Sequence, residues 1–165
     1  MAPKIFVLSG LPGVGKTFIA NQISKKANAK VLNTDQIRKE LFPNPTYSSE
    51  ESSKTYNELY SRAEKYLSSG QSVVLDATFT LQVGRKRVEQ LADKNSVQVQ
   101  FIRVTCDEQT TKRRIRERTD SHSDADTEVY ELLKKSAEPF EREYIEIDNS
   151  GSKSNTISQL ETKVV

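Results

Sequence analysis

The segment GLPGVGKT at residues 10–17 constrains this chain most, because it matches the pattern G-x-x-x-x-G-K-[ST] and lies between a strand-like and a helix-like stretch. The continuous apolar run from Ile5 to Leu8 predicts a buried parallel strand. Apolar residues at helical spacing follow the segment, namely Ile19, Ala20, Ile23 and Ala27. This context predicts a phosphate-binding loop, where a glycine-rich turn with an exposed lysine would be the alternative.

Each residue type in this loop suits phosphate binding for a physical reason. The glycines allow a tight turn in which successive backbone N–H groups face one anion-binding hollow, at the positive end of the following helix dipole. Lys16 would place a positive charge on the terminal phosphates of a nucleoside triphosphate, and the Thr17 hydroxyl would ligate Mg²⁺. The predicted nucleotide-binding residues are therefore Gly10, Leu11, Pro12, Gly13, Val14, Gly15, Lys16 and Thr17.

Length and composition narrow the class of protein. A chain of 165 residues suits one domain, and 25 basic against 23 acidic residues give a net charge of +2, which is not the strongly basic balance of a dedicated nucleic-acid-binding domain. The single cysteine, Cys106, rules out an intramolecular disulfide, and with a single histidine, His122, a zinc site is disfavoured. No apolar run approaches the roughly 20 residues of a membrane span, and the N-terminus lacks a signal-peptide core. We therefore expect a cytoplasmic protein with no membrane partner.

Five short apolar stretches alternate with helical patterns along residues 1–165, which predicts an α/β fold with one parallel sheet and helices on both faces. The predicted strands cover residues 5–8, 30–33, 72–75, 97–104 and 144–147. After the helix that follows the loop, the predicted helices cover residues 36–41, 48–70, 81–94, 107–118, 127–142 and 155–165. Pro139 is expected to bend or shorten the helix in which it lies.

Acidic residues follow three of the predicted strands, at Asp35, Asp76 and Asp107, and ligands of open α/β sheets bind outside the carboxyl ends of strands. Asp35 opens the phrase DQIRKEL, in which Arg38 lies one helical turn later. A carboxylate beside an arginine suits a hydroxyl acceptor, since the carboxylate takes the hydroxyl proton and the arginine holds the acceptor, for example through a phosphate. The alternatives are a helix N-cap at Asp35 or Thr34, and a surface charge or a glutamate ion pair for Arg38.

Asp76 follows the strand-like residues 73–75, and it is predicted either to hold Mg²⁺ through a water molecule or to position the acceptor. The alternative is an aspartate that forms the turn at the end of the strand. Asp107 is better explained as the N-cap of the next helix, so it is left out of the predicted site.

The stretch KRRIRER at residues 112–118 carries a local charge of +4 and precedes a polar, turn-rich stretch. Arg114 and Arg118 are four residues apart and therefore share one helix face. Arginines on a closing lid, here residues 112–126, suit phosphoryl transfer, where charge stabilisation and positioning supply most of the catalysis. The alternatives are a solvated helix face and a nucleic-acid patch. A second basic cluster at residues 85–87 is expected at the surface, with contact to an acceptor strand as the less favoured interpretation.

Three other features are expected to lie outside the chemistry. The sequence DNSG at residues 148–151 matches the D-x-x-G of a GTPase switch, but it follows the last strand, and the chain has no N-K-x-D guanine signature. It is therefore interpreted as a loop. His122 is expected on the lid or the surface, and Cys106 is expected to be a small core residue.

The phrases GLPGVGKT, NTDQIRKELF and VVLDAT, with the arginine-rich helix and the SDAD after it, resemble the small P-loop kinases known as the "AAA domain" or "predicted kinase" group. That superfamily includes the 5′-kinase domain of bacteriophage polynucleotide kinase, the zeta-toxin kinases, chloramphenicol phosphotransferase and gluconate-kinase-like proteins. The resemblance covers residues 4–147. It implies a three-layer P-loop kinase fold whose five-stranded parallel sheet has the order 2-3-1-4-5, with a short lid.

The resemblance also implies roles for residues on the nucleotide side. Lys16 and Thr17 would bind ATP and Mg²⁺. Arg114 and Arg118 would be lid arginines, with Arg118 acting on the transferred phosphate and Arg114 on the bound nucleotide. The loop at residues 149–152 would lie near the adenine.

On the acceptor side, the resemblance implies that Asp35 is the general base, that Arg38 binds an acceptor phosphate, and that Asp76 is the acidic residue that ends the third strand. The predicted function is transfer of the γ-phosphoryl group of Mg-ATP to a hydroxyl of a polynucleotide 5′ end, a nucleotide or a small metabolite. The alternatives are an ATP-binding regulatory ATPase or switch with no separate acceptor, and a toxin-like small-molecule kinase.

Overall fold

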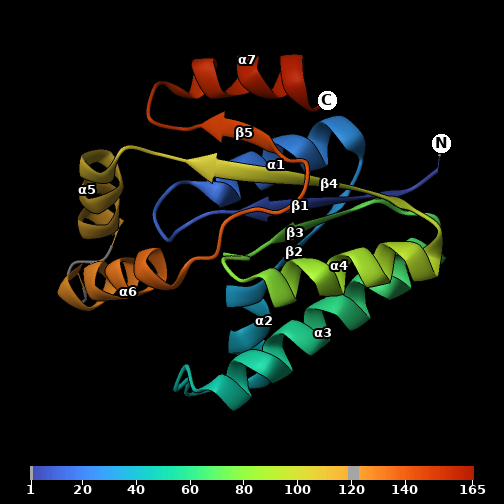
Figure 1. The fold of residues 1–165 in the computed structure, drawn as a ribbon, viewed down its shortest axis with the longest axis horizontal. Coiled ribbons are helices and arrows are strands. Elements are labelled where there is room, and N and C mark those ends of the chain that lie inside the picture. The colour runs from blue at the N-terminus through green and yellow to red at the C-terminus, as the bar shows by residue number, and fades with distance from the viewer. Residues whose placement is uncertain (1, 119–122) are drawn as a thin grey trace.

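The structure is a computed structural model that describes residues 2–118 and 123–165, with the backbone alone described for residues 123–126. Its centre is a five-stranded parallel sheet in the order β2-β3-β1-β4-β5 (Figure 1). The predicted α/β fold and the predicted strand order are both confirmed. The strands are β1 (Lys4–Ser9), β2 (Lys30–Asn33), β3 (Val73–Asp76), β4 (Gln98–Thr105) and β5 (Ile145–Asp148).

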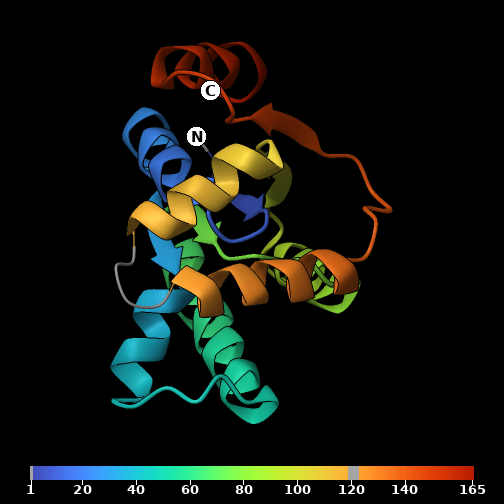
Figure 2. The same ribbon diagram turned by 90° about the vertical axis from the view of Figure 1, so that its left-hand side faces the viewer.

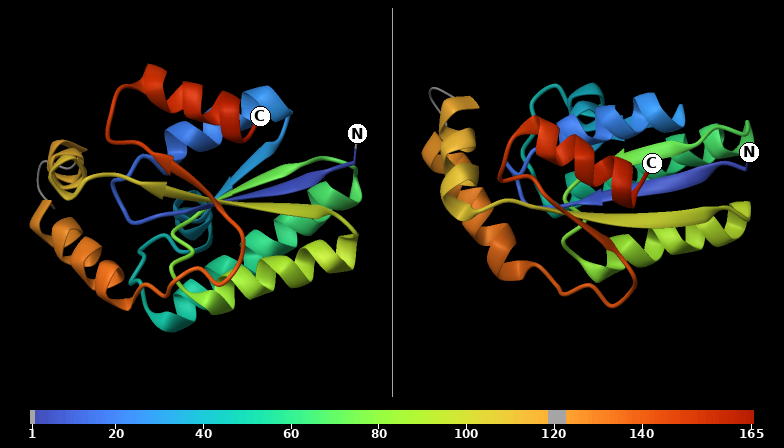
Figure 3. Two further views of the ribbon diagram at one scale, coloured as in Figure 1. Left: turned by 45° about the horizontal axis from the view of Figure 1, so that its top comes forward. Right: turned by 90° about the horizontal axis from the view of Figure 1, so that it is seen from above.

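Helices cover both faces of the sheet. Helices α1 and α7 lie on one face and helices α3 and α4 on the other, while α5 and α6 lie beyond the carboxyl ends of the strands (Figures 1 and 3). The view onto those carboxyl ends shows α5 crossing in front of the sheet, with α6 beside it (Figure 2). The helices are α1 (Lys16–Ala27), α2 (Thr34–Leu41), α3 (Ser49–Ser68), α4 (Gln82–Asn95), α5 (Glu108–Arg118), α6 (Ser123–Ser136) and α7 (Lys153–Lys163).

The core is divided into two layers by the sheet, because successive side chains of a strand point to opposite faces. In β1, Ile5 and Val7 pack with α3 and α4, whereas Phe6 and Leu8 pack with α1 and α7. All four residues of β3 are buried, as expected for an inner parallel strand covered on both sides. None of the helices in the described part of the chain is long and apolar enough to cross a lipid bilayer.

The edge strand β5 is covered by side chains of α7. Gln159 accepts a hydrogen bond from the backbone N–H of Asp148 at 3.0 Å and donates to the Asp148 carbonyl at 2.8 Å. Lys163 donates to the carbonyl of Glu146 at 3.1 Å. Polar backbone groups of this strand are therefore bound by the last helix.

Several helices differ from the prediction by two residues or more at a boundary, one of them being α7, which covers Lys153–Lys163 where residues 155–165 were expected. Helix α2 begins at Thr34, and its N-cap is Asn33, whose side chain accepts the Gln36 N–H; the predicted caps at Thr34 and Asp35 are wrong. Helix α6 begins at Ser123 and ends at Ser136, where a helix over residues 127–142 was expected. The chain leaves the helix before Pro139, because the N–H of Glu138 is donated to the carbonyl of Thr80 at 2.8 Å.

The expected surface position of Arg85 is wrong. Lys86 and Arg87 are exposed, but Arg85 is only 1% exposed. Its guanidinium group donates to the backbone carbonyls of Phe79, Glu138 and Pro139. These carbonyls supply the partners that a buried cation needs, and no pattern in a run of three basic residues shows which of them will have such partners.

Candidate active site

The loop at residues 10–17 connects β1 to α1 and has the backbone shape expected of a phosphate-binding loop. Gly13 and Gly15 have φ values of 84° and 92°, in the left-handed region where glycine is favoured. A Cβ atom at Gly15 would also overlap the side-chain amide of Asn149. The loop therefore depends on glycine at this position for both conformation and space.

Lys16, the first residue of α1, folds back over this loop. Its Nζ donates to the carbonyl of Gly10 at 2.9 Å and to that of Leu11 at 3.1 Å. Burial lowers the pKa of Lys16 to about 8, against the opposing effect of the nearby carboxylates of Asp76 and Asp35. The charge of Arg118 lowers that pKa further, so the predicted catalytic residues Asp35 and Arg118 both lie within electrostatic range of Lys16.

Thr17 and Asp76 form the second part of the site. The Thr17 hydroxyl donates to Asp76 Oδ2 at 3.0 Å, and the Asp76 side chain lies at the end of β3, with only 2% of the residue exposed. A hydroxyl and a carboxylate are the hard oxygen ligands that Mg²⁺ prefers, and Mg²⁺ keeps its other positions for water and phosphate oxygens. These two side chains therefore fit the predicted magnesium site.

Asn33 is a residue of this site that the sequence analysis missed. Its Nδ2 donates to Asp76 Oδ2 at 2.7 Å, while its Oδ1 accepts the N–H of Gln36 and caps α2. One amide thus joins the acidic residue of β3 to the helix that carries Asp35. The available signal was its position as the last residue of the second predicted strand, three residues before the predicted helix.

The two residues predicted on the acceptor side have different environments. Asp35 is exposed in the first turn of α2. Arg38 is 8% exposed, and its guanidinium pairs with the Glu51 carboxylate at 2.8 Å while lying 4.7 Å from the ring centroid of Tyr47. A second donor of Arg38 reaches the Ser52 hydroxyl at 3.3 Å. The alternative of a glutamate ion pair therefore describes Arg38 in this structure.

Glu51 is the centre of that arrangement. Burial alone would raise its pKa, but hydrogen bonds from Thr46, Arg38 and Tyr47 outweigh burial and lower the pKa to about 2. The carboxylate is therefore ionised at neutral pH, and it neutralises Arg38 while holding residues 46–47 against α3.

Residues 112–118 of the predicted lid belong to α5, and the described backbone of residues 123–126 begins α6. Arg114 donates to the carbonyl of Val14 and to Cys106 Sγ, both at 3.5 Å, so it lies against the phosphate-binding loop. Arg118 is exposed at the end of the helix. Lys112 pairs with Glu131 at 2.9 Å, which joins α5 to α6.

The remaining predictions about this region have mixed outcomes. Asp107 caps α5 as predicted, accepting the Thr110 N–H at 2.8 Å. Cys106 is half-buried against the apolar core, close to its predicted role. His122, which was expected on the lid or the surface, lies outside the described residues.

Asn149 opens the loop at residues 149–152 that was expected near the adenine, and its contacts were not part of that expectation. Its side chain donates to the carbonyl of Val14 at 2.8 Å and accepts from Thr156 at 2.6 Å, and its backbone N–H bonds to Thr105 at 2.7 Å. The loop after β5 is thereby fixed against the phosphate-binding loop. The D-x-x-G match contains this residue but gives no indication of that contact.

Comparisons with known proteins agree with this geometry. A model of the AAA domain family matches residues 5–140. An uncharacterised protein of Mycobacterium tuberculosis (strain ATCC 25618 / H37Rv) is 27% identical over 94% of the chain, which spans 34% of that relative's length. The 6-phosphofructo-2-kinase/fructose-2,6-bisphosphatase 3 of Rattus norvegicus is 30% identical over 66% of the chain and 23% of its own length.

Among solved structures, the APS kinase of Mycobacterium tuberculosis in complex with AMPPNP and APS shares the fold with a TM-score of 0.76. The match covers 98% of this chain and 96% of the kinase chain at 16% sequence identity. At that identity, the likeness concerns the fold.

Proposed function

Since this chain belongs to the AAA domain family, within the small P-loop kinase superfamily, we propose that it is an ATP-dependent kinase that phosphorylates a hydroxyl group. The single observation that carries the proposal is the position of the Lys16 amine, which lies on the phosphate-binding loop within electrostatic range of Asp76 and Asp35. A triphosphate site with one carboxylate for a cation and another for a proton is what phosphoryl transfer to a hydroxyl requires.

In the proposed reaction, the loop N–H groups and Lys16 bind the phosphates of ATP, and Arg114 contacts the nucleotide from α5. Mg²⁺, held by Thr17 and Asp76, would neutralise phosphate charge. Asp35 accepts the proton of the acceptor hydroxyl, and the acceptor oxygen attacks the γ-phosphorus as the bond to the ADP oxygen breaks. Arg118, which belongs to the lid that we place at residues 112–126, stabilises the charge on the transferring group.

The acceptor class follows from the residues around Asp35. Arg38 would bind a phosphate on the acceptor only if that anion displaced Glu51, whose carboxylate already neutralises the guanidinium group. This pairing favours a small hydroxyl-bearing metabolite over a polynucleotide 5′ end. By their names, the APS kinase and the phosphofructo-2-kinase among the similar proteins phosphorylate small molecules, which supports the same choice.

The test is phosphate transfer from labelled ATP to a panel of sugars, nucleosides, nucleotides and 5′-hydroxyl oligonucleotides. We expect Asp35→Ala to abolish transfer while the affinity for an ATP analogue stays within about threefold, because Asp35 is proposed to act only on the acceptor. Asp93→Ala, at an exposed carboxylate of α4, is the matched control and keeps full activity. Transfer at the wild-type rate by Asp35→Ala would exclude Asp35 as the base.

A regulatory ATPase or switch would use the same loop and would not need Asp35. ATP hydrolysis that a partner protein stimulates, together with no labelled acceptor in the whole panel, would favour that class over the kinase.

A further inference from the structure

Arg85 is the largest side chain among the fully buried residues of the described chain, and the proposed reaction does not use it. Its three hydrogen bonds all end on backbone carbonyls, at 3.1 Å to Phe79, 3.0 Å to Glu138 and 3.1 Å to Pro139. The ring of Phe140 covers the guanidinium face at 4.2 Å. One buried cation thus joins two segments that are more than 50 residues apart in the sequence.

The first segment is the turn that follows Asp76. The Phe79 carbonyl accepts hydrogen bonds from Arg85 Nη1 and from Ser9 Oγ, at 3.1 Å each. The Thr78 carbonyl accepts a hydrogen bond from the N–H of Gly10 at 3.0 Å. Phe79 has φ 43°, a left-handed conformation that costs a bulky residue free energy and persists only where its surroundings impose it. The turn after the proposed magnesium ligand is therefore held between the start of the phosphate-binding loop and Arg85.

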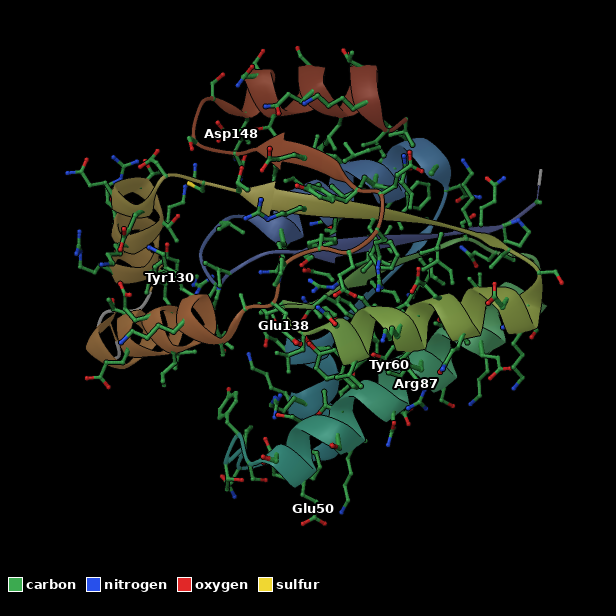
Figure 4. All side chains as sticks on the ribbon, in the orientation of Figure 1. Glu50, Tyr60, Arg87, Tyr130, Glu138 and Asp148 are labelled. Atoms are coloured by element: carbon green, nitrogen blue, oxygen red, sulfur yellow. The ribbon has the colours of Figure 1, made fainter. Side chains whose placement is uncertain are left out.

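The second segment, residues 137–144, follows helix α6. Glu138 lies between the end of α6 and the start of α4 (Figure 4). Its N–H donates to Thr80 at 2.8 Å, and its carboxylate accepts the N–H of Gln82 at 2.9 Å. Helix α6 is in turn joined to α5 by the Lys112–Glu131 pair at 2.9 Å and the Lys134–Glu108 pair at 3.3 Å. The position of this segment therefore fixes the helix that carries the lid arginines.

A cavity of about 700 Å³ adjoins this junction. Its lining includes Gly10 and Leu11 of the phosphate-binding loop as well as Arg85 and Glu138. Residues of the proposed phosphate site and residues that anchor the lid therefore line the same cavity. A displacement of Arg85 would change the positions of both groups.

We propose that Arg85 is a positioning residue for phosphoryl transfer: it ties the turn after Asp76 to the segment after α6, and it thereby sets where Arg114 and Arg118 meet the phosphate-binding loop. This inference rests on the proposed kinase function. A lysine is a poor replacement, because one ammonium group cannot reach carbonyls on two segments and stack on Phe140 as a planar guanidinium does.

The test compares Arg85→Lys and Arg85→Met with Arg142→Met. Arg142 also anchors residues 137–144, through Glu89 at 3.0 Å and the ring of Phe101, but it has no described contact with residues 78–80. We expect kcat, measured per folded protein, to fall about tenfold or more in both Arg85 variants, because small misplacements of catalytic groups cost that much. The dissociation constant of an ATP analogue stays within about threefold, and Arg142→Met keeps kcat within about twofold.

Hydrogen exchange gives a readout that needs no acceptor. In Arg85→Lys we expect faster exchange of the Gly10 amide, which is bonded to Thr78, and of the Glu138 amide, which is bonded to Thr80. In Arg142→Met only the Glu138 amide exchanges faster. If Arg85→Met does not fold, Arg85→Lys and Ser9→Ala, which removes the other donor to Phe79, carry the test.

The inference would be overturned by wild-type kcat in a folded Arg85 variant, or by unchanged exchange at Gly10. A loss of kcat in Arg142→Met equal to that in Arg85→Met would also overturn it, because the effect would then be one of general stability. If the wild-type protein phosphorylates nothing, the kinase proposal fails, while the exchange data still decide whether Arg85 joins the two segments.

Discussion

Three cations at this end of the sheet have different functions because each has a different set of partners. Lys16 bonds to loop carbonyls, Arg38 pairs with the Glu51 carboxylate, and Arg85 bonds to carbonyls of two segments. Of these three, Lys16 is the one that, among the described residues, neither pairs with a carboxylate nor joins two segments. Among these three cations, its charge is therefore the one available to an incoming phosphate.

The lowered pKa of Lys16 predicts pH-dependent nucleotide binding. At pH values below its pKa of about 8 the amine is charged, and at higher pH it loses the charge that attracts phosphate. We expect the dissociation constant of a non-hydrolysable ATP analogue to rise about tenfold from pH 7 to pH 9, as the protonated fraction falls. Titration calorimetry at the two pH values measures this. Lys16→Arg, which stays charged, should give the same affinity at both, and an equal rise in that variant would contradict the assignment.

The lowered pKa of Glu51 predicts a loss of stability in acid. Its pKa is about 2 in the folded protein against an ordinary value of 4.5, so its contribution is complete above the ordinary value and is lost as pH falls toward 2. We expect urea unfolding to show a smaller decline of stability over this range in Glu51→Gln than in wild type. The variant is also less stable at pH 7, because Arg38 loses its counter-charge.

Glu50 provides the control for that measurement. It is exposed and pairs only with Lys54 on the helix surface, so Glu50→Gln should follow the wild-type curve. Identical acid profiles for the wild type and Glu51→Gln would show that the Arg38 pair does not contribute to stability.

At the scale of elements, the end of β3 and the start of α2 are joined by Asn33. The serine variant Asn33→Ser keeps an oxygen that can cap the helix but loses the donor to Asp76. We expect its stability to stay within about 0.5 kcal/mol of wild type, whereas Asn33→Ala loses about 1 kcal/mol with the cap. Both variants should bind an ATP analogue more weakly in the presence of Mg²⁺, since Asp76 loses a hydrogen bond that orients it.

Urea unfolding and calorimetry with and without Mg²⁺ separate these two effects. If Asn33→Ser binds the analogue as wild type does, Asn33 is only a helix cap. If Asn33→Ala is as stable as wild type, the cap is not significant for α2.

The elements that local patterns specify were predicted well. The apolar patterns gave all five strands to within a few residues, because each strand holds at least two apolar residues and is followed by a polar break. The cap of α2 was wrong because Asn33, Thr34 and Asp35 are all residue types that can cap a helix, and Asn33 is the one that does. The end of α6 was wrong because it depends on the bond from the Glu138 N–H to Thr80 in another segment. Local propensity contains no information about such partners.

At the scale of the whole molecule, the motif at residues 10–17 predicted more than its own loop. Together with the phrases at residues 33–42 and 73–78, it carries the family resemblance that implied the strand order, and the structure confirms that order. The contacts of Asn149 and Arg85 were not predictable. Each joins segments far apart in the chain, and the residues around them in the sequence are ordinary polar or basic ones.

The hydrogen bonds from Gln159 and Lys163 to the outer strand have a consequence for self-association. An edge strand with free backbone groups is a template on which another chain can add a strand. Here the N–H and carbonyl of Asp148 and the carbonyl of Glu146 are already bound by side chains of the last helix. A strand of a second molecule could pair with β5 only after these hydrogen bonds break. Helix α7 therefore protects the edge strand from aggregation.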